Sequence, residues 1–185
     1  MRAITLSTLL LCHLAVVFPS WGQQPEHARS LAPYIPTPQL IVEKMLEAAQ
    51  VKSSDTLYDL GSGDGRIVIT AAQKYGAKAV GVELSEELFR STTERVKAMG
   101  LEDRVRIIHG DLLDVDLSPA DVVTIYLLTS SNERLKPNLE KYLKPGARVV
   151  SNDFEIRGWK PRNVVKITSG STTHSLYVYE IGKRK

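Results

Sequence analysis

The chain has 185 residues, of which 43% are hydrophobic and 24% are charged, and this length and composition are typical of one domain with a buried core. A formal net charge of +3 does not indicate a dedicated nucleic-acid surface, so we expect no nucleic-acid partner. The only cysteine is Cys12, so the chain beyond it lacks thiolates for covalent catalysis, iron–sulfur clusters or a zinc knuckle. His27, His109 and His174 are scattered rather than paired, and we expect no metal site.

The first residues have the pattern of a secretory signal peptide. An apolar run over residues 4–18 is followed by Ser20 and Gly22, which are small residues at the −3 and −1 positions for cleavage before Gln23. The run is shorter than the ~20 residues that a membrane-spanning helix needs. We therefore expect residues 1–22 to be cleaved, which would make the protein periplasmic or extracellular. The alternative is a leader that is kept as a membrane anchor.

The next stretch is expected to be extended. Residues 23–36 are polar and then proline-rich, and the run 33–38 is stiff because each proline fixes its own backbone and restricts the residue before it. Thr37 is a natural N-cap for a helix over residues 38–49, where apolar residues recur at helical spacing. We place one domain at residues 37–182 and a solvated basic tail at residues 183–185.

Strands and helices alternate through this domain. Further helices are expected at residues 66–75, at 86–99 and around Leu135, Leu139 and Leu143, and strands at residues 56–59, 79–83, 105–109, 122–128, 148–154, 163–168 and 174–181. A polar turn at residues 169–173 joins the last two strands as a hairpin. This order predicts an α/β fold with a doubly wound, Rossmann-like sheet of mostly parallel strands and flanking helices.

A glycine turn follows the first of these strands. The strand ends at Asp59, and Gly61, Gly63 and Gly65 then lead into the helix that begins near Arg66. Glycine lets a ligand approach the main chain, and such turns bind nucleotides at the carboxyl ends of parallel strands. A dinucleotide site would need the third glycine at position 66, one residue later than it occurs here. The spacing therefore disfavours a dinucleotide.

The pattern Asp-x-Gly-x-Gly-x-Gly resembles motif I of the class I S-adenosylmethionine-dependent methyltransferases, and the resemblance extends from Tyr34 to Glu180. Together with the runs at residues 33–38, 58–68, 110–112, 146–150 and 159–161, it makes the chain look like a small bacterial methyltransferase family. That family is similar to the lysine methyltransferases that modify the ATP synthase c subunit and the adenine nucleotide translocase. The resemblance implies S-adenosylmethionine as cofactor, a lysine ε-amine as acceptor, and a seven-stranded sheet whose last strand inserts antiparallel.

Three acids at successive strand ends predict the cofactor contacts. Asp59 can hold the ammonium group, the amides near Gly61 and Gly63 suit the carboxylate, and Glu83 can accept hydrogen bonds from both ribose hydroxyls. By the resemblance, Asp111 accepts from the adenine amino group and the next residue packs on the ring. The alternatives are a plain turn for the glycines, a helix-capping acid for Glu83 and a turn residue for Asp111. The expected cofactor-binding residues are Asp59, Gly61, Ser62, Gly63, Glu83, Asp111, Leu112 and Tyr126.

The acceptor side is defined first by what it lacks. Residues 125–128 read Ile-Tyr-Leu-Leu, where adenine amino methyltransferases carry Asn/Asp-Pro-Pro-Tyr/Phe and catechol-type enzymes hold magnesium with acids, so we expect neither nucleobase methylation nor a metal. Tyr126 could line the pocket or belong to the sheet core. Asp153, with Phe154 and Trp159, would lie at the mouth beside Tyr34 and could orient an amine or accept its proton. The alternative is an acid that ends a strand over a packed tryptophan.

We therefore name Asp153 and Tyr34 as candidate catalytic residues and expect a monomer that methylates a protein lysine or another small amine. Two alternatives remain, an O-methyltransferase of a small hydroxylated or carboxylic molecule and a non-catalytic nucleoside-binding domain. Contact with a membrane is expected only through the N-terminal segment. Export would separate the protein from a cofactor that is made in the cytoplasm.

Overall fold

The computed structural model describes residues 31–182. The predicted leader, residues 1–22, lies outside the described residues, as do residues 23–30 and the basic tail, so cleavage and export stay predictions. Between residues 31 and 182, no helix combines the length and the apolar character needed to cross a membrane.

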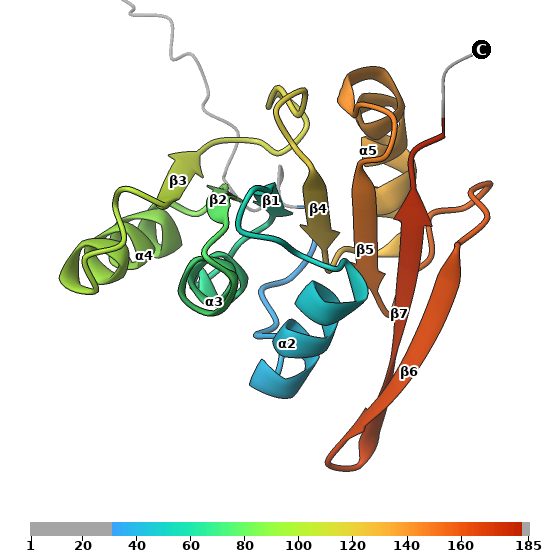
Figure 1. The fold of residues 1–185 in the computed structure, drawn as a ribbon, viewed down its shortest axis with the longest axis horizontal. Coiled ribbons are helices and arrows are strands. Elements are labelled where there is room, and N and C mark those ends of the chain that lie inside the picture. Colours follow the sequence, from blue (N-terminus) through green and yellow to red (C-terminus); the bar gives the residue numbers. More distant parts are fainter. Residues whose placement is uncertain (1–30, 183–185) are drawn as a thin grey trace, which may run out of the picture.

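A seven-stranded sheet forms the centre of the fold, in the order β3-β2-β1-β4-β5-β7-β6 (Figure 1). Neighbours from β3 across to β5 are parallel, whereas β7 runs antiparallel to both β5 and β6. The predicted doubly wound sheet with an inserted antiparallel last strand is therefore confirmed. The strands are β1 (Thr56–Leu60), β2 (Lys78–Glu83), β3 (Val105–His109), β4 (Val122–Ile125), β5 (Arg148–Asn152), β6 (Asn163–Ser169) and β7 (Thr172–Glu180).

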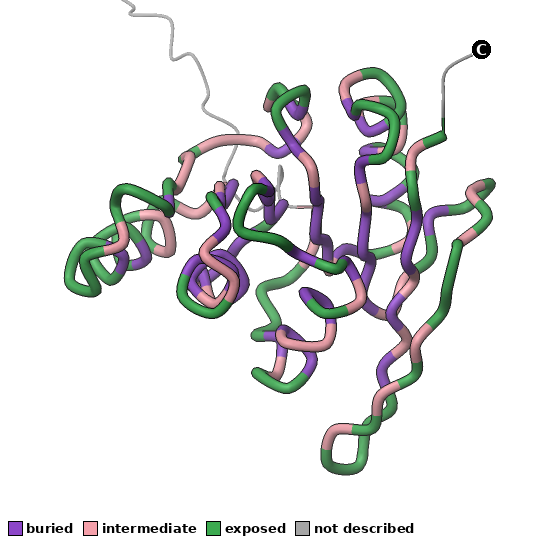
Figure 2. Tube along the Cα trace, viewed as in Figure 1, coloured by how far each residue is buried: buried purple, intermediate pink, exposed green. Residues whose placement is uncertain are grey.

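Helices cover both faces of this sheet. The chain forms α2 (Gln39–Ala48), α3 (Arg66–Tyr75), α4 (Glu86–Ala98) and α5 (Thr129–Tyr142). Side chains of α2, α3 and α4 pack with Leu57 and Val150 in one apolar cluster, and those of α5 pack with Tyr58 and Val149 in a second. Because neighbouring residues of a strand point to opposite faces, the two clusters lie on opposite sides of the sheet. Figure 2 shows the buried strands between helices whose outer sides are exposed.

Strand order reverses between β1 and β4, which are neighbours in the sheet although β2 and β3 separate them in the chain. The connections from these two strands run to opposite sides, so a crevice opens beyond their carboxyl ends. The glycine turn that follows β1 lies at this crevice, and the fold thus brings the predicted ligand-binding loop to the edge where such sheets bind ligands.

Several local expectations differ from the structure. The fifth strand was expected over residues 148–154, but it ends at Asn152 because Asp153 has a left-handed backbone, with φ +61°. The fourth strand was expected over residues 122–128, but it ends at Ile125 and the chain then enters α5. The apolar run continues because Leu127 is buried in the cluster beneath α5 after the strand has ended. Thr37 does not cap α2, since Pro38 is the N-cap residue and no side chain caps that end.

We predict that Gly65→Ala destabilises the fold more than a change at an equally left-handed but open glycine. Gly65 has φ +73°, and a Cβ there would lie 2.4 Å from Cγ2 of Thr92 on α4. Left-handed backbone plus this overlap should cost about 2–5 kcal/mol in the free energy of unfolding. Gly146, with φ +84° and nothing within 4 Å of a Cβ, is the matched control, and Gly146→Ala should cost only about 1–2 kcal/mol. Urea denaturation measures both, and equal losses would contradict the close packing of the turn on α4.

Candidate active site

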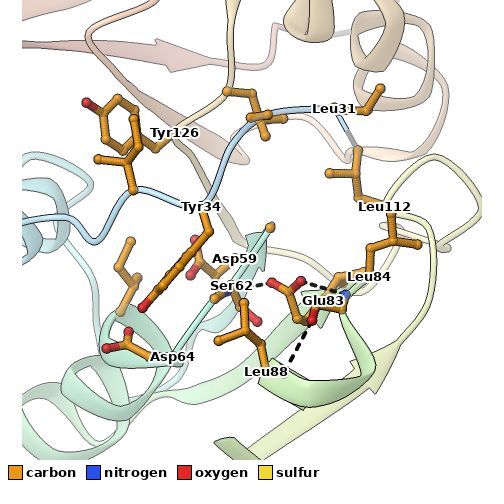
Figure 3. A pocket seen from close by; sticks show the side chains of 18 of the residues that line it. Leu31, Tyr34, Asp59, Ser62, Asp64, Glu83, Leu84, Leu88, Leu112 and Tyr126 are labelled. Carbon is orange, nitrogen blue, oxygen red and sulfur yellow. Dashed lines mark hydrogen bonds between the residues drawn. The ribbon is translucent and has the colours of Figure 1, made fainter. Parts of the chain in front are cut away.

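A cavity of about 310 Å³ opens beyond the carboxyl ends of β1, β2 and β4 (Figure 3). All eight residues that the sequence predicts to bind the cofactor line this cavity, and Tyr34 lines it as well. Asp59, Glu83 and Asp111 therefore share one hollow, although they come from the ends of three different strands. Asp153 is not among the lining residues.

The Glu83 carboxylate is held by two backbone amides. The Gly63 amide donates to Oε2 at 2.7 Å, and the Ser85 amide donates to Oε1 at 2.8 Å. The side chain is buried, yet it lines the cavity, and each carboxylate oxygen can accept more than one hydrogen bond. Glu83 is thus held in a fixed orientation and lines the cavity, where each of its two carboxylate oxygens can accept one more hydrogen bond. Two such acceptors suit the two hydroxyls of a diol.

The glycine turn is tied to β2 by its own amides. Those of Gly61 and Ser62 both donate to the carbonyl oxygen of Val82 at 2.9 Å. The Ser62 side chain packs against Gly81, where a Cβ would lie 2.6 Å from Oγ, and that buried hydroxyl has no hydrogen-bond partner among residues 31–182. A ligand carboxylate would therefore reach the amides of Gly61 and Gly63 only in competition with Val82 and Glu83.

Asp59 is a buried acid without a counter-ion. It is 3% exposed, and the hydroxyl of Thr124 donates to its Oδ1 at 2.8 Å. Burial, the hydrogen bond from Thr124 and the charges of Glu83 and Asp64 together bring the pKa of Asp59 to about 7, with burial as the largest cause and Thr124 as the only one that lowers it. Within residues 31–182, no cationic side chain contributes to this balance. A ligand ammonium would supply the missing positive charge.

Residues 31–37, which we call the strap, form one wall of the cavity. Ser131 on α5 donates to the carbonyl of Leu31, and Nη1 of Arg66 donates to the carbonyl of Thr37 at 2.6 Å. The ring of Tyr34 lies against the glycine turn, since a Cβ at Gly63 would come within 2.6 Å of it (Figure 3). The strap is therefore anchored at both ends and closes the cavity over the turn.

Arg66 owes its position to Asp64, which the sequence did not single out. Nε of Arg66 lies 2.9 Å from Oδ1 and Nη2 lies 2.6 Å from Oδ2 of this carboxylate. The hydrogen bonds and charge of Arg66 hold the pKa of Asp64 below its ordinary value. This bidentate pair aims the third guanidinium nitrogen at the strap. The sequence signal that could have indicated this ion pair is an aspartate, Asp64, two residues before an arginine that begins a helix.

The far wall is apolar. Leu84 and Leu88 line the cavity together with Leu112, which is itself 8% exposed (Figure 3). Asp111 accepts from the Leu113 amide at 2.9 Å, so it also has the turn-forming role that was its alternative interpretation. The three leucines can pack against a flat aromatic ring, and the carboxylate of Asp111 can accept a hydrogen bond from an amino group on that ring. Sequence reasoning missed Leu84 and Leu88, which read as ordinary helix-start residues.

The acceptor side combines Tyr126 with residues that follow β5 and with one residue of β7. Tyr126 lines the cavity, and its ring centroid lies 6.2 Å from that of Phe154. Burial raises the pKa of Tyr126, and the charge of Asp153 and a hydrogen bond with it raise it further. Asp153 in turn lies 2.8 Å from Nδ1 of His174, measured from Oδ2. Sequence reasoning missed His174, because an isolated histidine on a strand carries no signal of its own.

The expected place of Trp159 at the cavity mouth is wrong. Its Nε1 donates to Glu140 near the end of α5 at 2.9 Å, and its ring packs edge-on against Tyr179 at 5.5 Å. Tyr179 pairs with Val149 at the start of β5, so Trp159 lies at the opposite edge of the sheet from the cavity. The reason is topological, because β6 runs in the same direction as β5 and the link between them must return to the start of β5.

We predict that Asp59→Asn stabilises the ligand-free protein at pH 8. Because its pKa is raised from 3.8 to about 7, Asp59 contributes stability that is fully present below pH 3.8 and is lost as the pH rises through about 7. Asparagine can still accept from Thr124 but has no charge to bury. Urea denaturation should therefore show a higher free energy of unfolding for the variant at pH 8 and little difference near pH 4.

The matched control for this prediction is Asp114→Asn, since Asp114 is exposed. That variant should unfold like the wild type at both pH values. An Asp59→Asn protein that is less stable than the wild type at pH 8 would contradict the assigned burial cost.

Comparison with known proteins adds independent findings. Residues 59–163 match the family model described as the ANTKMT methyltransferase domain. The chain is 51% identical over 154 residues to a protein-lysine N-methyltransferase of Saccharolobus islandicus, which covers 83% of this chain and 96% of that protein. It is 31% identical over 150 residues to the Xenopus laevis lysine N-methyltransferase of the ATP synthase c subunit, which covers 81% of this chain and 64% of that protein.

A solved structure is also similar. It is described as an RNA methyltransferase from Salinibacter ruber in complex with S-adenosyl-L-homocysteine. The two chains are 44% identical with a TM-score of 0.77, and the match covers 82% of this chain and 96% of that one.

Proposed function

The chain belongs to the ANTKMT methyltransferase domain family, and we propose on that basis that it transfers a methyl group from S-adenosylmethionine to a protein lysine. The observation that carries the cofactor assignment is the common cavity of three carboxylates, Asp59, Glu83 and Asp111, beside the glycine turn.

The residues around the cavity fit this cofactor group by group. Asp59, buried without a counter-ion, matches the ammonium, and Glu83, fixed by two amides, matches the ribose diol. Asp111 and the apolar wall of Leu84, Leu88 and Leu112 match an adenine ring. When bound, the cofactor supplies an electrophilic methyl group on a sulfonium.

The protein contributes mainly alignment. Holding the acceptor nitrogen in line with the transferable methyl group can supply several of the roughly 7–11 kcal/mol available from orientation. We assign the strap with Tyr34 to excluding water from the cavity, because it covers the glycine turn, and Tyr126 to the acceptor end. Tyr34 thus supports the reaction as a wall of the site.

A protein lysine is the acceptor that the relatives favour. The Saccharolobus islandicus relative, described as a protein-lysine N-methyltransferase, is 51% identical and is covered over 96% of its length. The Salinibacter ruber structure, described as an RNA methyltransferase, makes RNA the second candidate. Against RNA, residues 125–128 lack the Asn/Asp-Pro-Pro-Tyr/Phe run of adenine amino methyltransferases. We therefore propose lysine and treat RNA as the competing outcome.

We predict that the protein transfers the tritium-labelled methyl group of S-adenosylmethionine to lysine. The protein and the labelled cofactor are incubated separately with the protein, RNA and small-molecule fractions of a cell extract. Acid hydrolysis and amino-acid analysis of the protein fraction should recover the label as methyllysine. Label found only in nucleosides after nuclease digestion would replace the proposal with RNA methylation. Label found only in an extractable small molecule would replace it with the O-methyltransferase alternative.

A separate test of the cofactor site is Glu83→Gln, which keeps the size of the side chain but removes the charge and half of its acceptor capacity. Its affinity for S-adenosylhomocysteine, measured by calorimetry, should fall about tenfold or more, in line with the loss of about 1.5–3 kcal/mol for charge-assisted hydrogen bonds. Equal affinity for wild type and variant would remove Glu83 from the cofactor site.

A further inference from the structure

A lysine acceptor must lose a proton before it can be methylated. Its ordinary pKa of about 10.4 leaves only about one amine in 2,500 neutral at pH 7. The cavity acids Asp59, Glu83 and Asp111 are committed to the cofactor under the proposed function. The acceptor end therefore needs a base of its own. Asp153 forms a hydrogen bond with Tyr126, which lines the cavity, and the ring of its neighbour Phe154 lies 6.2 Å from the Tyr126 ring, between centroids.

Asp153 has a strained backbone at the functional edge of the sheet. It follows β5 directly and has φ +61°, a left-handed conformation that is rare outside glycine. Such strain costs about 1–3 kcal/mol and persists where the surrounding structure enforces it. Here the Asp153 amide donates to the carbonyl of Ser175 at 2.8 Å, which holds the residue against β7. Its side chain remains 25% exposed, so a substrate can reach it.

Each oxygen of the Asp153 carboxylate has a partner from β7. The Ser175 amide donates to Oδ1 at 3.0 Å, and Nδ1 of His174 lies 2.8 Å from Oδ2. The His174 side chain is only 8% exposed, so its ring is fixed by packing. These two contacts orient the carboxylate, which also forms a hydrogen bond with Tyr126 at the cavity wall.

Joining β5 to β7 does not by itself require this arrangement. The antiparallel ladder already pairs the two strands from Arg148 to Asn152. Asp153 adds two hydrogen bonds to Ser175 beyond the ladder, but these bonds do not account for the contact of its other carboxylate oxygen with a buried histidine or for its position beside a cavity residue. The arrangement is explained if the carboxylate has a function at the acceptor end of the cavity.

We propose that Asp153 accepts the proton of the acceptor lysine and that His174 is the positioning residue that holds the Asp153 carboxylate for this step, an inference that rests on the proposed function. One N–H bond of the ammonium breaks and its proton passes to Asp153. The freed nitrogen lone pair forms the bond to the methyl carbon, while the carbon–sulfur bond breaks and its electron pair stays on sulfur. The products are a methylated ammonium, S-adenosylhomocysteine and protonated Asp153, which then releases its proton to solvent.

The test compares Asp153→Asn, His174→Ala and His174→Asn on the protein fraction that takes label from the wild type. Asparagine tolerates left-handed backbone and can still accept from Ser175, so Asp153→Asn removes the charge with little change in fold. Its kcat should fall about 100-fold or more, the usual contribution of a positioned base. His174→Ala should lower kcat about tenfold, and His174→Asn, which restores a donor near the Nδ1 position, should recover most of that loss.

Two further readings separate catalysis from stability. The affinity for S-adenosylhomocysteine and the melting temperature of Asp153→Asn should stay close to those of the exposed control Asp103→Asn. Ultraviolet titration against a Tyr126→Phe reference should show a lower pKa for Tyr126 once the Asp153 charge is removed, and this reading needs no acceptor.

The outcomes distinguish the two proposals. A wild type that labels lysine, with Asp153→Asn equally active or His174→Asn as slow as His174→Ala, would overturn only the inference about these residues. A wild type that labels no lysine would overturn the proposed function and the inference with it.

Discussion

The structure depends on burying a negative charge that the protein does not neutralise. Asp59 lies near the end of β1, a strand inside the sheet, and accepts from the hydroxyl of Thr124, while burial raises its pKa to about 7. Above pH 7 the ionised carboxylate costs the ligand-free fold stability, and a cationic ligand group would offset this cost. The glycine turn, the strap and Glu83 surround the same carboxylate, and their geometry follows from the need to close a small cavity over it.

The sequence could predict the elements whose signal is local. The helix over Arg66–Tyr75 and the strand over Val105–His109 have the bounds that their apolar periodicity and flanking residues indicate. Asp59, Glu83 and Asp111 could be grouped because parallel strands deliver their carboxyl ends to one edge of the sheet. Neither inference required knowledge of which side chains meet across the fold.

What could not be predicted depends on contacts between distant segments. Trp159 was misplaced because its position follows from the direction of β6, which the composition of the link does not encode. His174 contacts Asp153 only because β7 inserts beside β5, so the pair appears once the sheet order is known. The strand that begins at residue 122 was predicted too long. Leu127 is buried beneath α5 and not in the sheet, and both kinds of burial require an apolar residue, so the sequence does not distinguish them.

The strap also bears on how fast the cavity can exchange its contents. Two of its anchors are a neutral hydrogen bond from Ser131 and a charged one from Arg66, worth together about 2–4.5 kcal/mol. Lifting the strap breaks both bonds but leaves the sheet intact, so we expect it to be a local opening rather than global unfolding. Because Tyr34 lies on Gly63, the ring must leave the turn in the same movement. The residence time of a spent cofactor, and with it the turnover rate, is therefore set in part by seven residues that take no part in the chemistry.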